Sequence, residues 1–265
     1  MSQPGMSSTS KALSADDVLA LLARLQGITP PVLVGGQALN ILARHYRIDS
    51  EAPLTSQDVD FVGDEDEAEV VARAWQADLR IPSLDDHTPN TAILVVPRPG
   101  GQAPLTVDFL DTVAGVAFGG SVAFIELKSP DYPCTLRVLH PMACVQSRLW
   151  NIYGPLNRHD TREIERLRLA IRILHRHLTE HLPDSVRNGL NLVERFCRHT
   201  VLSRAGKQAW HHDHVDLMEA IPYQHPAWPP LFREKRWPEL QRHVQEARAR
   251  SAPSPKTQQP RPPSF

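Results

Sequence analysis

The hydrophobic pattern of the chain changes its period near Pro141, and this change constrains the fold more than any other feature. Before Pro141, short apolar segments bounded by turn residues are typical of strands, at 31–34, 58–62, 91–96, 105–110, 121–127 and 135–139. After it, apolar residues recur at helical spacing over residues 161–178 and 186–197. We therefore predict an α/β domain with a short mixed sheet over residues 13–140, followed by an all-helical domain over residues 141–250.

Helices are also predicted between the strands and near the end of the chain. Ser14 followed by two acidic residues is typical of an N-cap, and the helix that it starts should end at Gly27. Further helices are expected over residues 37–46 and 65–77, and a last one over 228–250, broken or bent near Pro238.

The two ends of the chain differ in composition from the rest. Residues 1–12 are polar and rich in serine, and residues 251–265 form a proline-rich tail. Both segments hold too few apolar groups to fold, so we expect them to be disordered. Of the 265 residues, 41% are hydrophobic, which is enough for one large core or two modest ones.

The charge of the chain is divided unevenly. Residues 1–140 contain 9 Lys and Arg against 18 Asp and Glu, whereas residues 141–265 contain 20 against 12. The balances of -9 and +8 suit an acidic metal-binding half beside a basic half that faces a polyanion. Two oppositely charged domains that attract one another are the alternative.

Targeting signals and cysteines narrow the class of protein. No apolar run reaches the roughly 18 residues that a membrane span needs, and residues 1–10 lack the features of a signal peptide. We therefore expect a cytoplasmic protein without a membrane partner. The three cysteines have neither the number nor the spacing of a disulfide framework or a zinc site.

The segment Thr55–Val62 (TSQDVDFV) carries the most chemical information. Residues two apart in a strand project to the same face, so Asp58 and Asp60 should place two carboxylates side by side in front of Val59 and Phe61. A divalent cation between them would relieve their repulsion, and Mg²⁺ prefers such ligands. A solvated acidic face on an edge strand is the alternative.

A third acid, Asp108, lies in the apolar strand LTVDFL at residues 105–110. A lone carboxylate in a buried strand is costly unless it is paired or bound to metal. Asp108 on a neighbouring strand could complete a two-metal site, in which one ion holds a triphosphate and the other activates a hydroxyl. Asp111 is the competing candidate, but it should face the other side of the strand or lie in the following turn.

A glycine pair, Gly35-Gly36, lies between a predicted strand and a predicted helix. Without Cβ atoms the backbone can approach a phosphate, and the helix N-terminus offers unpaired N–H groups. An ordinary tight turn explains a single glycine pair equally well.

Together, VLVGGQALNIL, SQDVDFV and LTVDFL, in this order, resemble the nucleotidyltransferase superfamily related to DNA polymerase β. The resemblance covers residues 30–112. It implies an α/β nucleotidyltransferase core in which Asp58, Asp60 and Asp108 are catalytic and bind Mg²⁺, while Gly35, Gly36 and Ser56 contact the nucleotide. The gap between Gly36 and Asp58 is longer than the family pattern suggests, and we attribute it to a loop inserted near residues 47–53.

Within the superfamily the chain looks most similar to AbiEii-type and minimal bacterial nucleotidyltransferases. Their helical half carries a Lys after the sheet and a basic residue with Asp before the next helix. Here Arg148 and the sequence Arg158-His159-Asp160 stand at these positions, which implies that Arg148 and Asp160 contact the nucleotide. Arg keeps the charge of Lys but changes its geometry, and Asp160 also fits an ordinary N-cap.

Two further clusters have simpler explanations. The tract His211-His212-Asp213-His214 is better explained as a solvated helix end than as a metal site, because adjacent rings rarely converge on one ion. Five arginines, Arg162, Arg166, Arg168, Arg172 and Arg176, cover the outer face of a predicted helix. They either solvate that face or contact an RNA backbone.

The function predicted from the sequence is therefore Mg²⁺-dependent transfer of a nucleoside monophosphate from a nucleoside triphosphate to an acceptor hydroxyl. The resemblance implies RNA such as tRNA as the acceptor, a role as a toxin or in phage defence, and an antitoxin protein as a partner. Two alternatives stay open: an antibiotic-modifying type of nucleotidyltransferase that acts on a small molecule, and a catalytically silent member that binds RNA or a partner protein.

Overall fold

The computed structural model describes residues 13–25, 27–49, 58–98, 103–116, 124–132 and 134–251. The predictions for residues 1–12, for the tail after Ser251, for Ser56 and for most of the loop at 47–53 lie outside these ranges. The chain forms two compact units, residues 1–177 and 178–265. The change from strands to helices falls at His140, as the hydrophobic period predicts, but the division between the units comes later, inside a helix.

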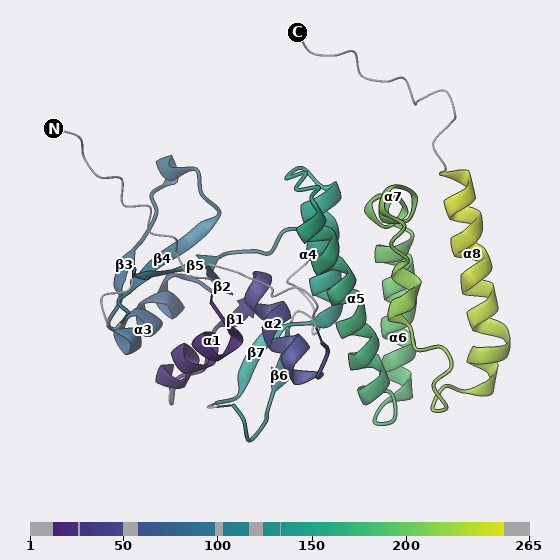
Figure 1. Cartoon of the computed structure of the whole chain (residues 1–265), viewed down its shortest axis with the longest axis horizontal. Helices are drawn as coiled ribbons and strands as arrows, with labels where there is room; N and C mark the ends of the chain where they lie inside the picture. The colour runs from purple at the N-terminus through teal and green to yellow at the C-terminus, as the bar shows by residue number, and fades with distance from the viewer. Residues whose placement is uncertain are drawn as a thin grey trace, which may run out of the picture. The chain divides into compact units, whose positions relative to one another are not determined.

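A seven-stranded mixed sheet forms the centre of the first unit, with the order β3-β4-β5-β2-β1-β7-β6 (Figure 1). Strand β2 pairs in parallel with β5, and β1 pairs in parallel with β7; the other neighbours are antiparallel. The strands are β1 (Val32–Val34), β2 (Val59–Val62), β3 (Asp78–Arg80), β4 (Asn90–Val96), β5 (Leu105–Leu110), β6 (Phe124–Leu127) and β7 (Leu136–Leu139). The predicted α/β class with a mixed sheet followed by helices is confirmed.

One strand is not among those predicted. Strand β3 has three residues, of which only Leu79 is apolar, and it lies at an edge of the sheet beside β4. So short a segment with one apolar residue gives no period to recognise. The expected pair of strands at 91–96 and 105–110 is confirmed as the antiparallel pair β4–β5.

The helices of the first unit follow local signals in the sequence. Helix α1 (Ala15–Leu22) starts with a capping box, in which Ser14 Oγ accepts from the Asp17 N–H and the Asp17 carboxylate accepts from the Ser14 N–H. Helix α2 (Gly35–His45) follows β1 directly and packs against β1, β2 and β7. The remaining helices are α3 (Glu65–Trp75), α4 (Pro141–Tyr153) and α5 (Thr161–His181).

The alternation of side chains separates a core face of the sheet from a polar face. Phe61 of β2 and Phe109 of β5 are fully buried with ring centroids 5.6 Å apart, and the ring of Trp75 lies 6.1 Å from Phe61. Asp60 directly precedes Phe61, and Asp108 directly precedes Phe109, so both acids project from the opposite face of the sheet. The aromatic core thus fixes the face on which the acids lie.

The second unit is helical. It contains the end of α5, then α6 (Val186–Phe196), α7 (Arg204–Asp213) and α8 (Trp237–Arg250). Two five-residue π-helical segments, Cys197–Val201 and Phe232–Arg236, directly follow α6 and directly precede α8. Pro238 lies in the first turn of α8, directly after the π-helical segment Phe232–Arg236. The helical stretch therefore runs into this residue and changes its hydrogen-bonding pattern there, as expected near a proline, which has no N–H to donate to the preceding turn. For helix α7 the sequence predicts only the end, at residues 211–214, and not its extent.

Candidate active site

A cavity of about 650 Å³ within the first unit gathers most of the residues singled out in the sequence. Asp58, Asp60 and Asp108 line it together with Gly35 and Gly36 at the start of α2. Four arginines also line it: Arg148 from α4, and Arg158, Arg162 and Arg166 from the start of α5 and the segment before it. Leu110, Val113, Ala114 and Leu156 add an apolar part. The cavity therefore combines carboxylates and guanidinium groups with a helix N-terminus.

The strand register brings two of the acids together. Strands β2 and β5 run in parallel, and in their register Asp60 stands directly opposite Asp108. Both side chains therefore leave the sheet on the same face, as the alternation in each strand predicts. Asp58 lies two residues before Asp60, directly ahead of β2, and is exposed. Asp111, the competing candidate, follows the end of β5, is exposed and does not line the cavity.

The glycine at position 35 is required by its conformation and by its neighbour. Its φ of +67° is in the left-handed region that residues with a Cβ atom rarely adopt. A Cβ atom on Gly35 would also overlap the Oδ2 atom of Asp60. The start of α2 can approach the carboxylate this closely only because residue 35 has no side chain.

The pKa values of Asp60 and Asp108 are raised, as is typical of carboxylates that repel one another in a site suited to a cation. Burial, together with the carboxylates of Asp108 and Asp58, raises the pKa of Asp60 from 3.8 to about 6, against the opposing effect of Arg148 and Arg166. Burial and Asp58 also raise the pKa of Asp108, against a hydrogen bond in which Asn90 Nδ2 donates to Asp108 Oδ1 at 3.0 Å. The repulsion would be relieved by a bound cation.

The donor chemistry fits Mg²⁺ with help from a substrate. In the part of the chain that the structure describes, no three His, Cys, Asp or Glu side chains form a ready-made metal-binding group. Mg²⁺ usually takes one or two protein carboxylates and completes its octahedron with waters and substrate phosphates. Asp58 and Asp60 meet that requirement, and Asp108 lies beside them on the next strand.

On the cationic side, Arg148 is only 7% exposed and shares a buried carboxylate with Arg166. Glu163 Oε2 accepts from Arg148 Nη1 at 3.1 Å, and Glu163 Oε1 accepts from Arg166 Nη1 at 2.5 Å. Burial lowers the pKa of Arg148, while Glu163 counteracts this shift. Arg148 therefore lines the cavity and is held by Glu163, an acid that the sequence pattern does not point to.

Asp160 lies at the N-terminus of α5, and its Oδ1 atom accepts from the backbone N–H of Glu163 at 2.8 Å. This is the N-cap geometry that the sequence offered as one of two explanations. Asp160 is not among the described residues that line the cavity. Its neighbour Arg158 does line it, so of the sequence Arg158-His159-Asp160 the basic residue is the one that faces the candidate site.

The five arginines of α5 do not share one outer face. Arg162 and Arg166 line the cavity, whereas Arg168, Arg172 and Arg176 are exposed away from it. Arg172 Nη1 donates to the carbonyl oxygen of Asp49 at 3.2 Å. The expectation of one outer face is therefore wrong, because Arg162 and Arg166, four residues apart on the first turns of α5, line the cavity that also contains the acids. Contact of these arginines with RNA stays a prediction.

Residues 211–214 lie at the end of α7, which ends at Asp213. His212 and His214 are exposed, and His211 Nε2 is 3.1 Å from the carbonyl oxygen of Arg248. These residues form a helix end, as the simpler explanation predicts.

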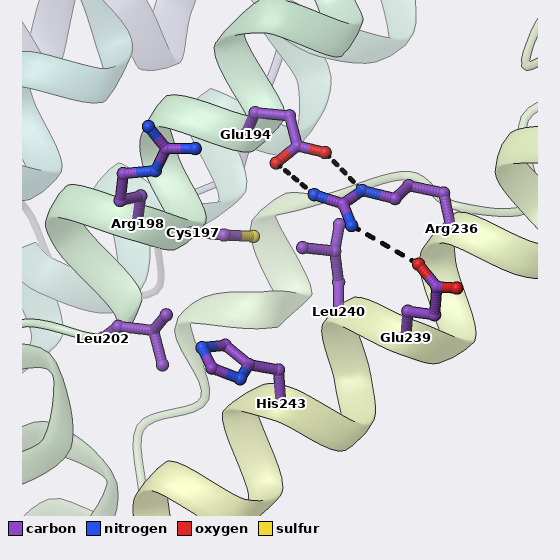
Figure 2. A pocket seen from close by; sticks show the side chains of 8 residues that line it. All are labelled: Glu194, Cys197, Arg198, Leu202, Arg236, Glu239, Leu240 and His243. Atoms are coloured by element: carbon purple, nitrogen blue, oxygen red, sulfur yellow. Dashed lines mark hydrogen bonds and ion pairs between the residues drawn. The ribbon is translucent and has the colours of Figure 1, made fainter.

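A second cavity, of about 310 Å³, lies within the second unit (Figure 2). Arg236 donates to both oxygens of Glu194, at 2.5 and 2.7 Å, and also to Glu239 at 3.4 Å. Arg198 and His243 complete the polar lining, and Cys197, Leu202 and Leu240 the apolar part. The two carboxylates and two guanidinium groups of this lining balance in charge. The first cavity differs, because its acids lie together on the side of the sheet.

Asn90 and Glu163 are the residues of the site that the sequence does not reveal. Asn90 opens a strand and Glu163 lies in the first turn of a helix, where Asn and Glu are common for structural reasons. Their roles depend on contacts across 18 and 15 residues of sequence, which no local pattern records.

Comparison with known proteins gives distant structural similarities. No protein-family model matches the chain, and no curated protein sequence is significantly similar to it. An antigenic nucleotidyltransferase-like protein from Paracoccidioides brasiliensis is 18% identical, with a TM-score of 0.41, over 61% of this chain and 78% of its own. The antibiotic-resistance factor ANT(2'')-Ia is 17% identical, with a TM-score of 0.41, over 70% and 99%. JHP933 from Helicobacter pylori is 17% identical, with a TM-score of 0.42, over 88% and 89%.

Among the helices that the structure describes, none is long and apolar enough to cross a membrane.

Proposed function

We propose that the protein is a nucleotidyltransferase that moves a nucleoside monophosphate from a nucleoside triphosphate to an acceptor hydroxyl. One observation carries the proposal: Asp58, Asp60 and Asp108 share a cavity with the N-terminus of α2 and four arginines. Carboxylates suit divalent cations, whereas helix N-termini and guanidinium groups suit phosphates. The cavity thus offers a partner for each charged part of a magnesium–triphosphate complex.

Each group has a role in the transfer. Asp58 and Asp60 would hold Mg²⁺, which when bound neutralises phosphate charge and lowers the pKa of a coordinated hydroxyl. The backbone at Gly35 and Gly36 would contact the phosphates, and Arg148 and Arg166 would stabilise the charge that develops on them. Asp108, held by Asn90, would accept the proton of the acceptor hydroxyl. The hydroxyl oxygen then bonds to the α-phosphorus as the bond to the β-phosphate breaks, and pyrophosphate leaves.

We further propose that the acceptor is RNA. Arg158 and Arg162 are exposed and line the cavity, so they are placed where an incoming phosphate backbone would meet them. A small-molecule acceptor is the competing candidate, and the apolar part of the cavity around Leu156 and Val113 favours it. A tRNA acceptor, a toxin or phage-defence role, an antitoxin partner and a cytoplasmic location stay predictions from the resemblance.

The test is to incubate the protein with each labelled nucleoside triphosphate, Mg²⁺ and either total RNA or a panel of hydroxylated small molecules. Transfer of label to RNA would support the full proposal, and transfer to a small molecule would replace the acceptor. The matched variants are Asp108→Asn and Asp111→Asn, because the two acids lie three residues apart and only Asp108 lines the cavity. We expect Asp108→Asn to lose transfer and Asp111→Asn to keep it. If no triphosphate and no acceptor give a product, the chain is a silent member.

A further inference from the structure

The carboxylate of Glu163 contacts two arginines on the cationic side of the cavity. Its side chain is 7% exposed, and those of its partners Arg148 and Arg166 are 9% and 11% exposed. Each oxygen of Glu163 accepts from a different arginine, at 3.1 Å from Arg148 Nη1 and 2.5 Å from Arg166 Nη1. One carboxylate therefore bridges two guanidinium groups.

An acid beside these arginines is unexpected if their only role is to attract an anion by their positive charge. Glu163 cancels one of their two charges, and by charge alone it weakens the attraction of any anion in the cavity. Two buried guanidinium groups that lie side by side need a counter-ion, however, because they repel one another and are poorly hydrated. The bridge allows both arginines to stay side by side at the cavity.

The bridge also fixes the direction of the guanidinium groups. A guanidinium is planar and carries five N–H donors, and the described hydrogen bond of Arg148 to Glu163 uses only Nη1. Other donors of Arg148 remain for a ligand, since its side chain lines the cavity. Because the fork is rigid, holding one nitrogen sets where the others point.

We propose that Glu163 is a positioning residue that orients Arg148 and Arg166 to bind the triphosphate. This inference rests on the proposed function, because the triphosphate is the ligand that the oriented arginines serve. Glu163 does not itself contact the nucleotide. Its contribution comes from fixed geometry and outweighs the positive charge that it cancels.

Two substitutions separate geometry from charge. Glu163→Gln removes the negative charge and offers only one oxygen, so it accepts from one arginine and presents an NH₂ group to the other. Glu163→Asp keeps the charge but is one methylene shorter, so its oxygens cannot reach both arginines in the same way. Glu165→Gln is the matched control, because Glu165 lies on the same helix, is exposed and is absent from the cavity lining.

The experiment measures the Kd of ATP, GTP, CTP and UTP, each with Mg²⁺, by calorimetric titration of the full chain, well below the melting temperature of each variant. For the triphosphate that binds the wild type best, we expect Glu163→Gln to weaken binding at least tenfold and Glu163→Asp at least threefold. Glu165→Gln should bind as the wild type does. If Glu163→Gln does not fold, the Asp variant decides the question.

The outcomes separate the two proposals. If the wild type binds a triphosphate and a folded Glu163 variant binds it equally well or more tightly, Glu163 is only a structural counter-ion and the inference is overturned. A fall in melting temperature without a change in Kd leads to the same conclusion. If the wild type binds none of the four triphosphates, the proposed function fails, and the inference fails with it.

Discussion

Asp60 is the residue whose protonation most directly links the fold to the site. Its pKa is raised from 3.8 to about 6, so between these values the folded chain holds a proton that the unfolded chain has lost. This contribution to stability is complete below about pH 4 and is lost as the pH rises through about 6. Above that pH an ionised Asp60 lies partly buried beside two other carboxylates, and the fold tolerates this cost where the proposed cation would bind.

We predict that Asp60→Asn stabilises the protein at pH 8 and leaves its stability nearly unchanged at pH 4. Because the pKa of Asp60 is raised from 3.8 to about 6 and the side chain is partly exposed, the gain in the free energy of unfolding at pH 8 should be on the order of 1–2 kcal/mol. Chemical denaturation at pH 4, 6 and 8 measures it. The same variant should lose the rise in melting temperature that Mg²⁺ with a nucleoside triphosphate produces in the wild type. An equal difference in stability at pH 4 and 8 would contradict the assignment.

The conformation of Gly35 leads to a second prediction at this scale. Gly35→Ala places a Cβ atom in the left-handed region and against Asp60, whereas Gly27→Ala has the same strain, at φ +76°, with nothing within 4 Å of the added atom. Gly27→Ala should cost about 1–2 kcal/mol, and Gly35→Ala clearly more.

Denaturation of both variants measures the difference, and the double variant Gly35→Ala/Asp60→Ala identifies its source. Once the carboxylate is gone, the cost of Gly35→Ala should fall to that of Gly27→Ala. Equal costs for the two single variants would mean that the start of α2 moves away from Asp60 easily.

In the first turns of helix α5, some residues stabilise the helix and others line the candidate binding site. Asp160 caps the helix, Glu163 bridges two arginines, and Arg162 and Arg166 line the cavity. The sequence predicts the helix and its cap from local signals, but the direction in which the helix presents its arginines depends on packing.

We predict that Asp160→Ala lowers stability by about 1 kcal/mol through loss of the cap. Asp160→Ser, which restores a capping oxygen without the charge, should be close to the wild type in stability. Both variants should bind a magnesium–triphosphate complex with wild-type affinity. Thermal unfolding and nucleotide titration on the same samples test this, and weaker binding by the Ser variant would instead support the nucleotide contact that the resemblance implies for Asp160.

The elements with the strongest local patterns are the ones that the sequence predicts best. The alternation in VDFV and LTVDFL predicts both strands and the face of the sheet on which each acid lies. Asp60 and Asp108 then lie side by side in the register of the parallel pair β2–β5. Strand β3 and helix α7 lack such patterns, since one is three residues long and the other has few apolar residues. The bridge at Glu163 could not be predicted, because it joins two helices through side-chain geometry alone.

The difference in net charge between the two units is smaller than the difference between the two halves of the sequence. Divided at His177, the first unit holds 16 Lys and Arg against 21 Asp and Glu, and the second holds 13 against 9, giving -5 and +4. Part of the basic half is therefore the arginine side of the acidic unit's own cavity. The first unit contains both signs of charge around one site.

We predict that RNA binding depends on this local group of arginines rather than on the net charge of the second unit. Charge reversal at Arg158 and Arg162 should weaken RNA binding and reduce the slope of log affinity against log salt by about 1–2, because each lost contact with a single strand removes about 0.7. Reversal at Arg233 and Arg242, exposed in the second unit, is the control with equal change of charge.

Filter binding or fluorescence anisotropy at several salt concentrations gives the slopes, and circular dichroism checks that both double variants fold. A larger loss of slope in the control pair would assign RNA binding to the second unit. Unchanged slopes in both pairs would favour a small-molecule acceptor.

The parallel register of β2 and β5 also bears on how this chain can change in evolution. A single residue inserted or deleted inside either strand turns every following side chain to the other face, and would move one of the two facing aspartates into the aromatic core. The chain between these strands contains α3, β3 and β4, whose residues Trp75 and Asn90 contact Phe61 and Asp108, so its length can change only in the segments between these elements. Descendants of this sequence should therefore vary in the length of those segments while the spacing of the acids within each strand stays fixed.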